Sequence, residues 1–263
     1  MDLGLRDRVA IVTGSSQGIG KAIALGLANE GATVTLCARN LEAVRDAARE
    51  ISTATGRAIV PLQVDLRRRD DIASMVEKTV ARYGRIDVLI NDTGGPPARR
   101  FLDTTDDDGR QAIDGLLLSA VTCSRAVIPS MTQHQWGRII NVTSFAAKQP
   151  AAGLILSNAL RAGVLGLTKT LAQEVAASGI LVNAVYPEWT HTRRLEALAQ
   201  VQAERDGSTV EGVIAGWTQD IPLKRLARPD EIAHLVVFLA SENARYLTGA
   251  VIQVDGGLIK SLT

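Results

Sequence analysis

Three glycines, Gly14, Gly18 and Gly20, follow a short apolar run at residues 9–12 and could hold a phosphate. Glycine at such a junction permits a tight turn, lets the backbone approach a pyrophosphate, and allows a helix to pack closely on a strand. The helix that follows would offer unpaired N–H groups and a positive dipole end to an anion. The spacing departs from G-x-G-x-x-G, but a glycine loop that opens a chain-long βαβ pattern favours a nucleotide site over a structural turn.

Arg39 ends the second apolar run of the chain and bears on the choice of nucleotide. The side chain at this place in a dinucleotide-binding fold meets the 2′ position of the adenosine ribose. A carboxylate there would favour a free hydroxyl, whereas a planar guanidinium suits a phosphate. The pattern therefore predicts NADP(H) in preference to NAD(H). The alternative is an exposed arginine that caps the following turn.

Short apolar, β-rich runs alternate with longer helical patterns along the chain, which is typical of repeated βαβ units. The predicted fold is a doubly wound, Rossmann-type α/β domain with a parallel sheet of about seven strands and helices on both faces. Strands are expected at Arg8–Thr13, Thr33–Ala38, Ala58–Val64, Val88–Ile90, Arg138–Val142, Leu181–Val185 and Val251–Val254. Helices are expected at Gly18–Asn29, Leu41–Thr53, Arg69–Arg82, roughly Asp107–Met131, Ala152–Ala177 and Asp230–Ala240. The polar stretch 190–222, with two short amphipathic patterns, is interpreted as a helical lid.

The composition is typical of one soluble domain spanning residues 1–263, with 46% hydrophobic residues and no linker-like run. Because 29 basic residues face 28 acidic ones, neither nucleic acid nor a membrane surface is an expected partner, and the arginines at 67–69 are interpreted as a solvated helix start. Cys37 and Cys123 lack a metal-like or redox-like spacing, so no metal site is expected. No apolar signal region or uninterrupted membrane-spanning run is apparent, which favours a cytoplasmic location.

Six motifs occur in order along the chain: Thr13-Gly14-x-x-x-Gly18-x-Gly20, Asn91-Asp92-Thr93-Gly94, Arg138-Ile139-Ile140-Asn141-Val142-Thr143-Ser144, Asn183-Ala184-Val185-Tyr186-Pro187, Leu247-Thr248-Gly249 and Val254-Asp255-Gly256-Gly257. Their order and spacing resemble those of the short-chain dehydrogenase/reductase family, nearest to its 3-oxoacyl-carrier-protein-reductase-like branch. The resemblance implies a nicotinamide-dependent oxidoreductase. It also implies cofactor contacts from Gly14, Ser16, Gly18, Ile19, Gly20, Arg39, Asp65, Leu66, Asn91, Arg161, Pro187 and Thr192.

The same resemblance locates the catalytic positions, for which the family uses Asn, Ser, Tyr and Lys. Ser144 matches the serine, but Ser157 stands at the tyrosine position, Arg161 at the lysine position and Leu116 at the asparagine position. A serine hydroxyl is shorter and far less acidic than a phenol, whose ordinary pKa is about 10. Arg161 can bond a ribose or stabilise an oxyanion, but it stays protonated and so cannot shuttle a proton. Leu116 cannot organise water.

Two functional hypotheses follow from these replacements. In the first, hydride transfer persists, with Ser144 and Arg161 polarising a carbonyl and the proton coming from water or a nearby side chain. In the second, the nucleotide site is only a scaffold, and the pocket performs a cyclisation or elimination or binds a ligand or partner. The glycine loop and Arg39 favour the first hypothesis, whereas Leu116, Ser157 and Glu188 favour the second. On balance the first is favoured slightly.

Four side chains are candidates for the missing proton donor. Ser157 is one, and His191 lies at the mouth of the predicted lid. Tyr186 ends the sixth predicted strand, where packing is the simpler explanation of it. Glu188 stands where the family carries glycine, so its carboxylate could crowd the nicotinamide or act as a replacement acid.

The expected substrate is a bulky, largely apolar small-molecule carbonyl compound, because Leu116, Trp189 and apolar lid positions would border the pocket. Small residues on the helix predicted at 152–177 could allow close contact across a symmetric interface, as in a homodimer or homotetramer. Packing of those residues against the protein's own sheet explains the pattern equally well. They are Ala159, Ala162, Gly163 and Gly166.

Overall fold

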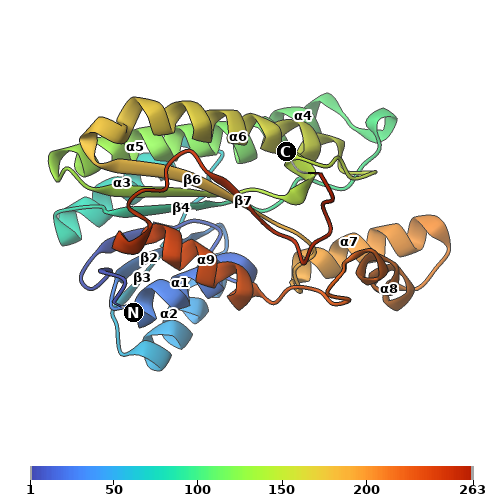
Figure 1. Ribbon diagram of the computed structural model, residues 1–263, viewed down its shortest axis with the longest axis horizontal. Coiled ribbons are helices and arrows are strands. Elements are labelled where there is room, and N and C mark those ends of the chain that lie inside the picture. The colour runs from blue at the N-terminus through green and yellow to red at the C-terminus, as the bar shows by residue number, and fades with distance from the viewer. Residues whose placement is uncertain (1, 262–263) are drawn as a thin grey trace.

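The computed structural model describes residues 2–261 and confirms the predicted Rossmann-type fold (Figure 1). Within this range the strands form one parallel sheet of seven, in the order β3-β2-β1-β4-β5-β6-β7. β1 and β4 are neighbours at the point where the strand order reverses, which is where ligands bind in doubly wound sheets. The strands are β1 (Val9–Val12), β2 (Thr33–Ala38), β3 (Ile59–Gln63), β4 (Val88–Asp92), β5 (Gly137–Val142), β6 (Ile180–Pro187) and β7 (Val251–Val254).

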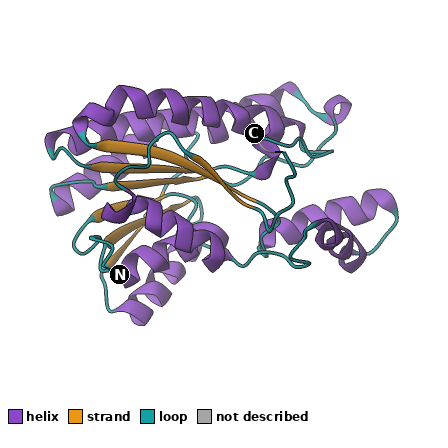
Figure 2. Cartoon of the chain, viewed as in Figure 1, coloured by secondary structure: helices purple, strands orange, loops and turns teal. Residues whose placement is uncertain are grey.

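Helices cover both faces of the sheet (Figure 2). On one face α1 packs against α2 and α9, and on the other α3 packs against α5, with α6 alongside. A further pair, α7 and α8, pack on each other beyond the carboxyl end of β6. The helices are α1 (Gly18–Asn29), α2 (Leu41–Thr55), α3 (Arg69–Tyr83), α4 (Asp106–Ala112), α5 (Ser119–Gln133), α6 (Ile155–Val175), α7 (Arg193–Asp206), α8 (Val210–Asp220) and α9 (Pro229–Ala240).

Strand residues divide alternately between two hydrophobic clusters, one on each face of the sheet. Val88 and Ile90 of β4 belong to the cluster beneath α1 and α9, whereas Leu89 between them belongs to the cluster beneath α3 and α5. Side chains along a strand point to opposite faces, so a strand covered on both sides must be apolar throughout. The continuous Val, Ile and Leu runs of the sequence are explained in this way.

Two of the predicted helices differ from the observed ones. The helix expected at about 107–131 is divided into α4 and α5 by a π-helical turn, Ile113–Leu118, which buries Leu116. A π turn holds about one residue more than an α-helical turn, and the apolar pattern of the sequence does not reveal this difference. Such turns are often found at functional sites. The helix expected from Ala152 begins only at Ile155, because Gly153 adopts a left-handed φ of 77°.

The segment Asp106–Gln133 is, by length and composition alone, long and apolar enough to cross a membrane. In the fold it serves as a layer of the domain, since Cys123, Val127 and Met131 are buried in the cluster beneath α3 and α5. Core helices of soluble proteins pass the same test, so this helix gives no argument for a membrane-spanning role.

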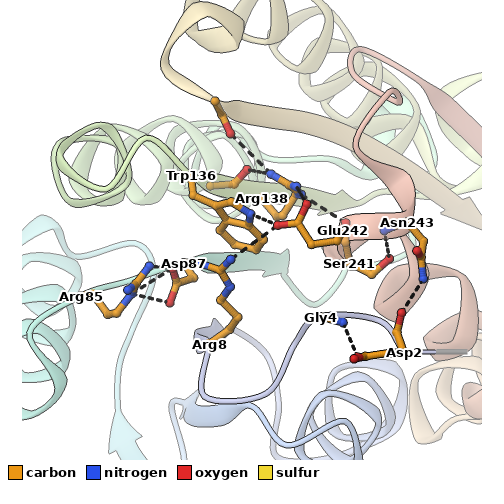
Figure 3. A network of polar contacts seen from close by, with 12 residues as sticks. Asp2, Gly4, Arg8, Arg85, Asp87, Trp136, Arg138, Ser241, Glu242 and Asn243 are labelled. Atoms are coloured by element: carbon orange, nitrogen blue, oxygen red, sulfur yellow. Dashed lines mark hydrogen bonds and ion pairs between the residues drawn. The ribbon is translucent and has the colours of Figure 1, made fainter.

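A buried carboxylate ties together the amino edge of the sheet (Figure 3). Asp87, which is fully buried, accepts hydrogen bonds from the Arg8 and Arg85 guanidinium groups and from the backbone N–H of Val9. The Trp136 ring contacts the guanidinium groups of Arg8 and Arg138, at 3.8 and 4.1 Å from its centroid. These contacts fix the sheet at the end opposite to the site.

Candidate nucleotide cleft and active site

The carboxyl ends of β1, β2, β3 and β4 border a cleft of about 980 Å³. Five of the residues expected to contact a dinucleotide line it: Gly14, Ser16, Arg39, Asp65 and Leu66. They come from loops after three different strands, which are neighbours only because the sheet places them side by side. The cleft therefore gathers the predicted adenosine and phosphate contacts on one surface.

In the glycine loop, backbone oxygens lie where the Cβ atoms of other residues would be. Gly14 has a left-handed φ of 59°, and a Cβ on it would lie 2.5 Å from the carbonyl oxygen of Asp92. A Cβ on Gly20 would lie 2.6 Å from the carbonyl oxygen of Gly14. The N-cap of α1, Gln17, gives no side-chain hydrogen bond, and the first turn has no acidic residue. The first turn of α1 thus fits the phosphates of a dinucleotide.

The remaining predicted loop residues adjoin the cleft rather than line it. Gly18 lies against Thr192, whose methyl carbon would be 3.3 Å from a Cβ at that position. Ile19 turns its side chain into the hydrophobic core, so only its backbone faces the loop. Thr192 caps α7 by accepting from the Leu195 N–H, which brings the start of α7 over the glycine loop. Pro187 ends β6 and is buried.

Two guanidinium groups lie where the loops after β2 and β3 border the cleft. The exposed Arg39 side chain makes no hydrogen bond or ion pair within residues 2–261. Arg67 also lines the cleft and binds the Asp65 carboxylate through Nε and Nη2, at 2.9 and 2.6 Å. This hydrogen bonding by Arg67 lowers the pKa of Asp65. Interpreting Arg67 only as part of a solvated helix start was therefore incomplete.

A carboxylate that sequence reasoning did not single out lies beside the glycine loop. Asp92 lines the cleft, and its carboxylate accepts a hydrogen bond from the Gly20 N–H at the start of α1. Burial raises the pKa of Asp92 to about 6, although the charge of Arg161 and the Gly20 N–H act in the opposite direction. The signal was present in the sequence, where Asp92 replaces the second asparagine of the family motif.

Arg161 is buried, and its guanidinium makes hydrogen bonds within the protein. Nε donates to Ser157 Oγ at 3.2 Å, Nη1 donates to the carbonyl oxygens of Val142 and Thr143 at 3.2 and 2.8 Å, and Nη2 donates to that of Thr93 at 3.4 Å. These bonds join α6 to the carboxyl ends of β4 and β5. Burial lowers the pKa of Arg161 to about 10, so it stays charged at neutral pH.

The predicted catalytic serines differ in accessibility. Ser144 is half-buried, and its Oγ accepts from the Ala146 N–H at 3.3 Å, so its own hydroxyl proton is free to bond a ligand. Ser157 is buried beneath Arg161. Asn91 donates to Asn141 Oδ1 at 2.8 Å and shares a cavity of only about 10 Å³ with Arg161 and Leu116, so its amide braces the strand ends.

The other candidate proton donors are placed away from Arg161. The Tyr186 hydroxyl donates to Gln253 Oε1 at 2.6 Å, and the ring is buried, as its interpretation as a packing residue predicts. His191 is exposed and lies 3.6 Å from Glu196. Glu188 is buried with both carboxylate oxygens unpaired, and burial, reinforced by Asp255 and Asp220, raises its pKa to about 8.

Glu188 faces a cavity of about 80 Å³ beneath the loop between α8 and α9. That cavity is bordered by Leu223, Arg225 and Asp255, whereas Ser144, Ser157 and Arg161 are absent from its lining. The geometry therefore gives no support to the idea that the Glu188 carboxylate crowds a nicotinamide or replaces the phenol.

The parallel sheet, the glycine loop after its first strand and the cleft across its carboxyl edge define a Rossmann-class protein with a dinucleotide-sized site. The chain belongs to the short-chain dehydrogenase/reductase family of oxidoreductases. The family model described as Enoyl-(Acyl carrier protein) reductase matches residues 14–259.

Similar proteins include a 3-oxoacyl-[acyl-carrier-protein] reductase of Thermotoga maritima, which is 35% identical over 255 residues, 97% of this chain and 99% of the relative. Among solved structures, L-sorbose reductase from Gluconobacter frateurii complexed with NADPH and L-sorbose has a TM-score of 0.95 at 33% identity, with both chains covered completely. An actinorhodin polyketide ketoreductase variant with NADPH has a TM-score of 0.93 at 31% identity over 97% of this chain and 98% of that one.

Proposed function

We propose that this protein is an NADP(H)-dependent oxidoreductase that interconverts a small-molecule carbonyl compound and its alcohol. The observation that carries the proposal is the cleft, where the glycine loop, Arg39, Asp65 and Leu66 form one continuous wall. Solved relatives that contain NADPH support the same assignment. In this cofactor position a glycine loop and helix N-terminus suit a pyrophosphate, and an unpaired guanidinium suits a 2′-phosphate.

Different residues would bind different parts of the nucleotide. The backbone N–H groups of Gly18 and Ile19 would hold the phosphates, and Arg39 would hold the 2′-phosphate, with Arg67 near enough to add its charge. Leu66 would pack on the adenine ring. Residues 190–222, which include α7 and α8, would close over the bound substrate as a lid.

A reduced nicotinamide, when bound, supplies a hydride to a carbonyl carbon. The Ser144 hydroxyl, whose proton is free, would donate to the carbonyl oxygen and orient it. Arg161 adds a fixed positive charge at the strand ends, but its bonds to three carbonyl oxygens leave it little freedom to approach a substrate. The proton would come from water admitted beside Ser144, because Ser157 is buried and Tyr186 is engaged elsewhere.

The second candidate is a protein of this fold that binds the nucleotide without using it for redox chemistry. The observation that favours it is the same bonding of Arg161, since a guanidinium bound to backbone is typical of a structural residue. In that case the pocket would carry out an elimination or cyclisation, or would bind a ligand only.

Self-association in the cytoplasm, as a homodimer or homotetramer, is part of the proposal. Ala159, Ala162, Gly163 and Gly166 are all exposed on the outer face of α6. Packing against the protein's own sheet therefore does not explain these small residues. An exposed row of small side chains allows another helix to approach closely.

The test is a titration of the purified protein with NADPH and NADH by calorimetry, with Arg39→Ala and Arg45→Ala as variants. Arg45, on α2, is also exposed but is not among the residues that line the cleft, so it controls for loss of a positive charge. NADPH should bind more tightly than NADH by about tenfold or more, and Arg39→Ala alone should remove the difference. Equal affinities in the unaltered protein would refute the cofactor preference.

Single-turnover measurements separate the two candidates. Loss of NADPH absorbance on mixing with a panel of ketones, aldehydes and keto acids would establish the oxidoreductase. Tight NADPH binding with no oxidation of the nucleotide by any of them would favour the non-redox candidate.

A further inference from the structure

A further cavity, of about 260 Å³, shares no lining residue with the cleft of about 980 Å³. Most of its lining residues come from the loop after β4, the residues that precede α6, and the helices α7 and α8. Figure 1 shows where these helices lie in the fold. Leu154 in its lining comes directly before α6, and Trp189 in its lining contacts Phe145, the neighbour of Ser144. The cavity wall is therefore connected, through Phe145, to the segment that carries Ser144.

One side of the cavity is apolar and rigid. The Trp189 and Trp217 rings stack with centroids 4.2 Å apart and planes 6° from parallel, and the Phe145 ring meets Trp189 edge-on at 5.0 Å. Leu198 and Val201 of α7 continue this wall. The wall suits an apolar body of the substrate, such as a ring or a short alkyl segment.

The opposite side of the cavity is lined by guanidinium groups. Arg99, Arg100 and Arg205 line the cavity, and Asp103 is the one acidic side chain among the lining residues that the structure describes. The Arg100 side chain makes no hydrogen bond or ion pair with any residue in 2–261. The Asp206 carboxylate is near enough to be affected by the charge of Arg100, but the unfilled N–H groups of this guanidinium are ready donors for an oxyanion.

The other two arginines are only partly engaged. Arg99 Nε lies 3.4 Å from the Asp108 carboxylate, and Nη1 donates to the Asp103 carbonyl oxygen at 3.3 Å. Arg205 holds Asp206 through Nε and Nη2, which leaves Nη1 free. That nitrogen faces the cavity, since it lies 3.3 Å from the place of a Cβ on Gly153. Because Asp103, Asp108 and Asp206 offset most of the positive charge of these arginines, the site suits a singly charged group better than a doubly charged phosphate.

We propose that this cavity binds the carboxylate end of the substrate, which is a small carbonyl compound with an apolar body and one acid group. The apolar body lies on the Trp189 and Trp217 wall, and the acid is held by Arg100 and Arg205. The carbonyl then projects toward Ser144. This inference rests on the proposed function only for the place where the carbonyl reacts, because the binding of the acid is independent of any nucleotide.

The experiment measures binding and needs no turnover. Titration with 4-oxocyclohexanecarboxylate and with its methyl ester is followed by tryptophan fluorescence, because two of the chain's 3 tryptophans form the cavity wall. The acid should bind about tenfold or more tightly than the ester, as expected for a charge-assisted hydrogen bond. The double variant Arg100→Ser, Arg205→Gln should bind both compounds equally. Arg245→Ala, which removes an exposed charge outside the cavity lining, should behave like the unaltered protein.

Equal binding of acid and ester by the unaltered protein, or absence of binding by both, would overturn the inference. So would a preference for the acid that survives in the double variant. Competition by inorganic phosphate that exceeds competition by acetate would overturn the assignment of a single charge. Preference for the acid in a protein that fails to bind NADPH would disprove the proposed function and leave this inference standing.

Discussion

Replacing Asp92 by asparagine should strengthen the binding of NADPH at neutral pH. The carboxylate lies at the first turn of α1, where it accepts the Gly20 N–H, and a dinucleotide phosphate would arrive beside it. Two like charges at about 6 Å repel by about 3 kcal/mol at an effective dielectric of about 20. That repulsion is enough to hold the carboxyl protonated in the complex, so binding must take up a proton.

The size of the effect follows from the pKa of Asp92, about 6 in the free protein. The carboxyl is then about nine-tenths ionised at pH 7 and about one-tenth ionised at pH 5. Proton uptake therefore weakens binding about tenfold at pH 7 and hardly at all at pH 5. Arg161, on α6, attracts the Asp92 carboxylate, and Arg194, on α7, is close enough to Arg161 to lower its pKa. Both remain charged over this range.

The assay is the ratio of the NADPH dissociation constants of the unaltered protein and Asp92→Asn, measured by calorimetry from pH 5 to 8. The ratio cancels the titration of the nucleotide's own 2′-phosphate, whose pKa is about 6. It should rise from near one at pH 5 to about ten at pH 7. Asparagine keeps the acceptor for the Gly20 N–H, and Asp70→Asn, an exposed change on α3, is the control. A ratio near one at every pH would refute the reasoning.

Three further outcomes are expected. Glu188→Gln should flatten the pH dependence of stability. The pKa of Glu188 is about 8 in the folded protein against an ordinary value of 4.5, so the free energy of unfolding of the unaltered protein should fall between about pH 4.5 and 8, by at most about 1.4 kcal/mol per pH unit. Urea unfolding at several pH values that gives the same pH dependence in both proteins would contradict this. Gly14→Ala should lower the free energy of unfolding by about 1–3 kcal/mol, because it places a Cβ at a left-handed φ and against the Asp92 carbonyl oxygen. Gly216→Ala on α8, with open space at its Cβ, should not lower it, and calorimetric melting temperatures that fall equally would count against the turn argument. The double variant Ser157→Tyr, Arg161→Lys should gain turnover of simple ketones with NADPH if only the proton relay has been lost. A variant that is folded, as judged by circular dichroism, but inactive would favour the non-redox candidate.

Helices and strands were predictable because their signals are local. Apolar runs bounded by turns identified each strand, and the glycines after residue 13 indicated the loop between β1 and α1. The π-helical turn at Ile113–Leu118 was not predictable, since a single added residue changes the side-chain direction without changing the composition. The fold was thus predicted almost completely, and the boundaries of its longest helices were not.

The sequence by itself determined the parallel sheet, the glycine loop and the presence of an arginine at the end of β2, because each depends on residues adjacent in the chain. Only the tertiary structure decided what Arg67, Asp92 and Arg161 do. Arg67 joins Arg39 in the cleft, Asp92 bonds the start of α1, and Arg161 is bound to the backbone at two strand ends. The partners of these charges come from distant parts of the chain, and burial, which sets their pKa values, is a property of the packed protein.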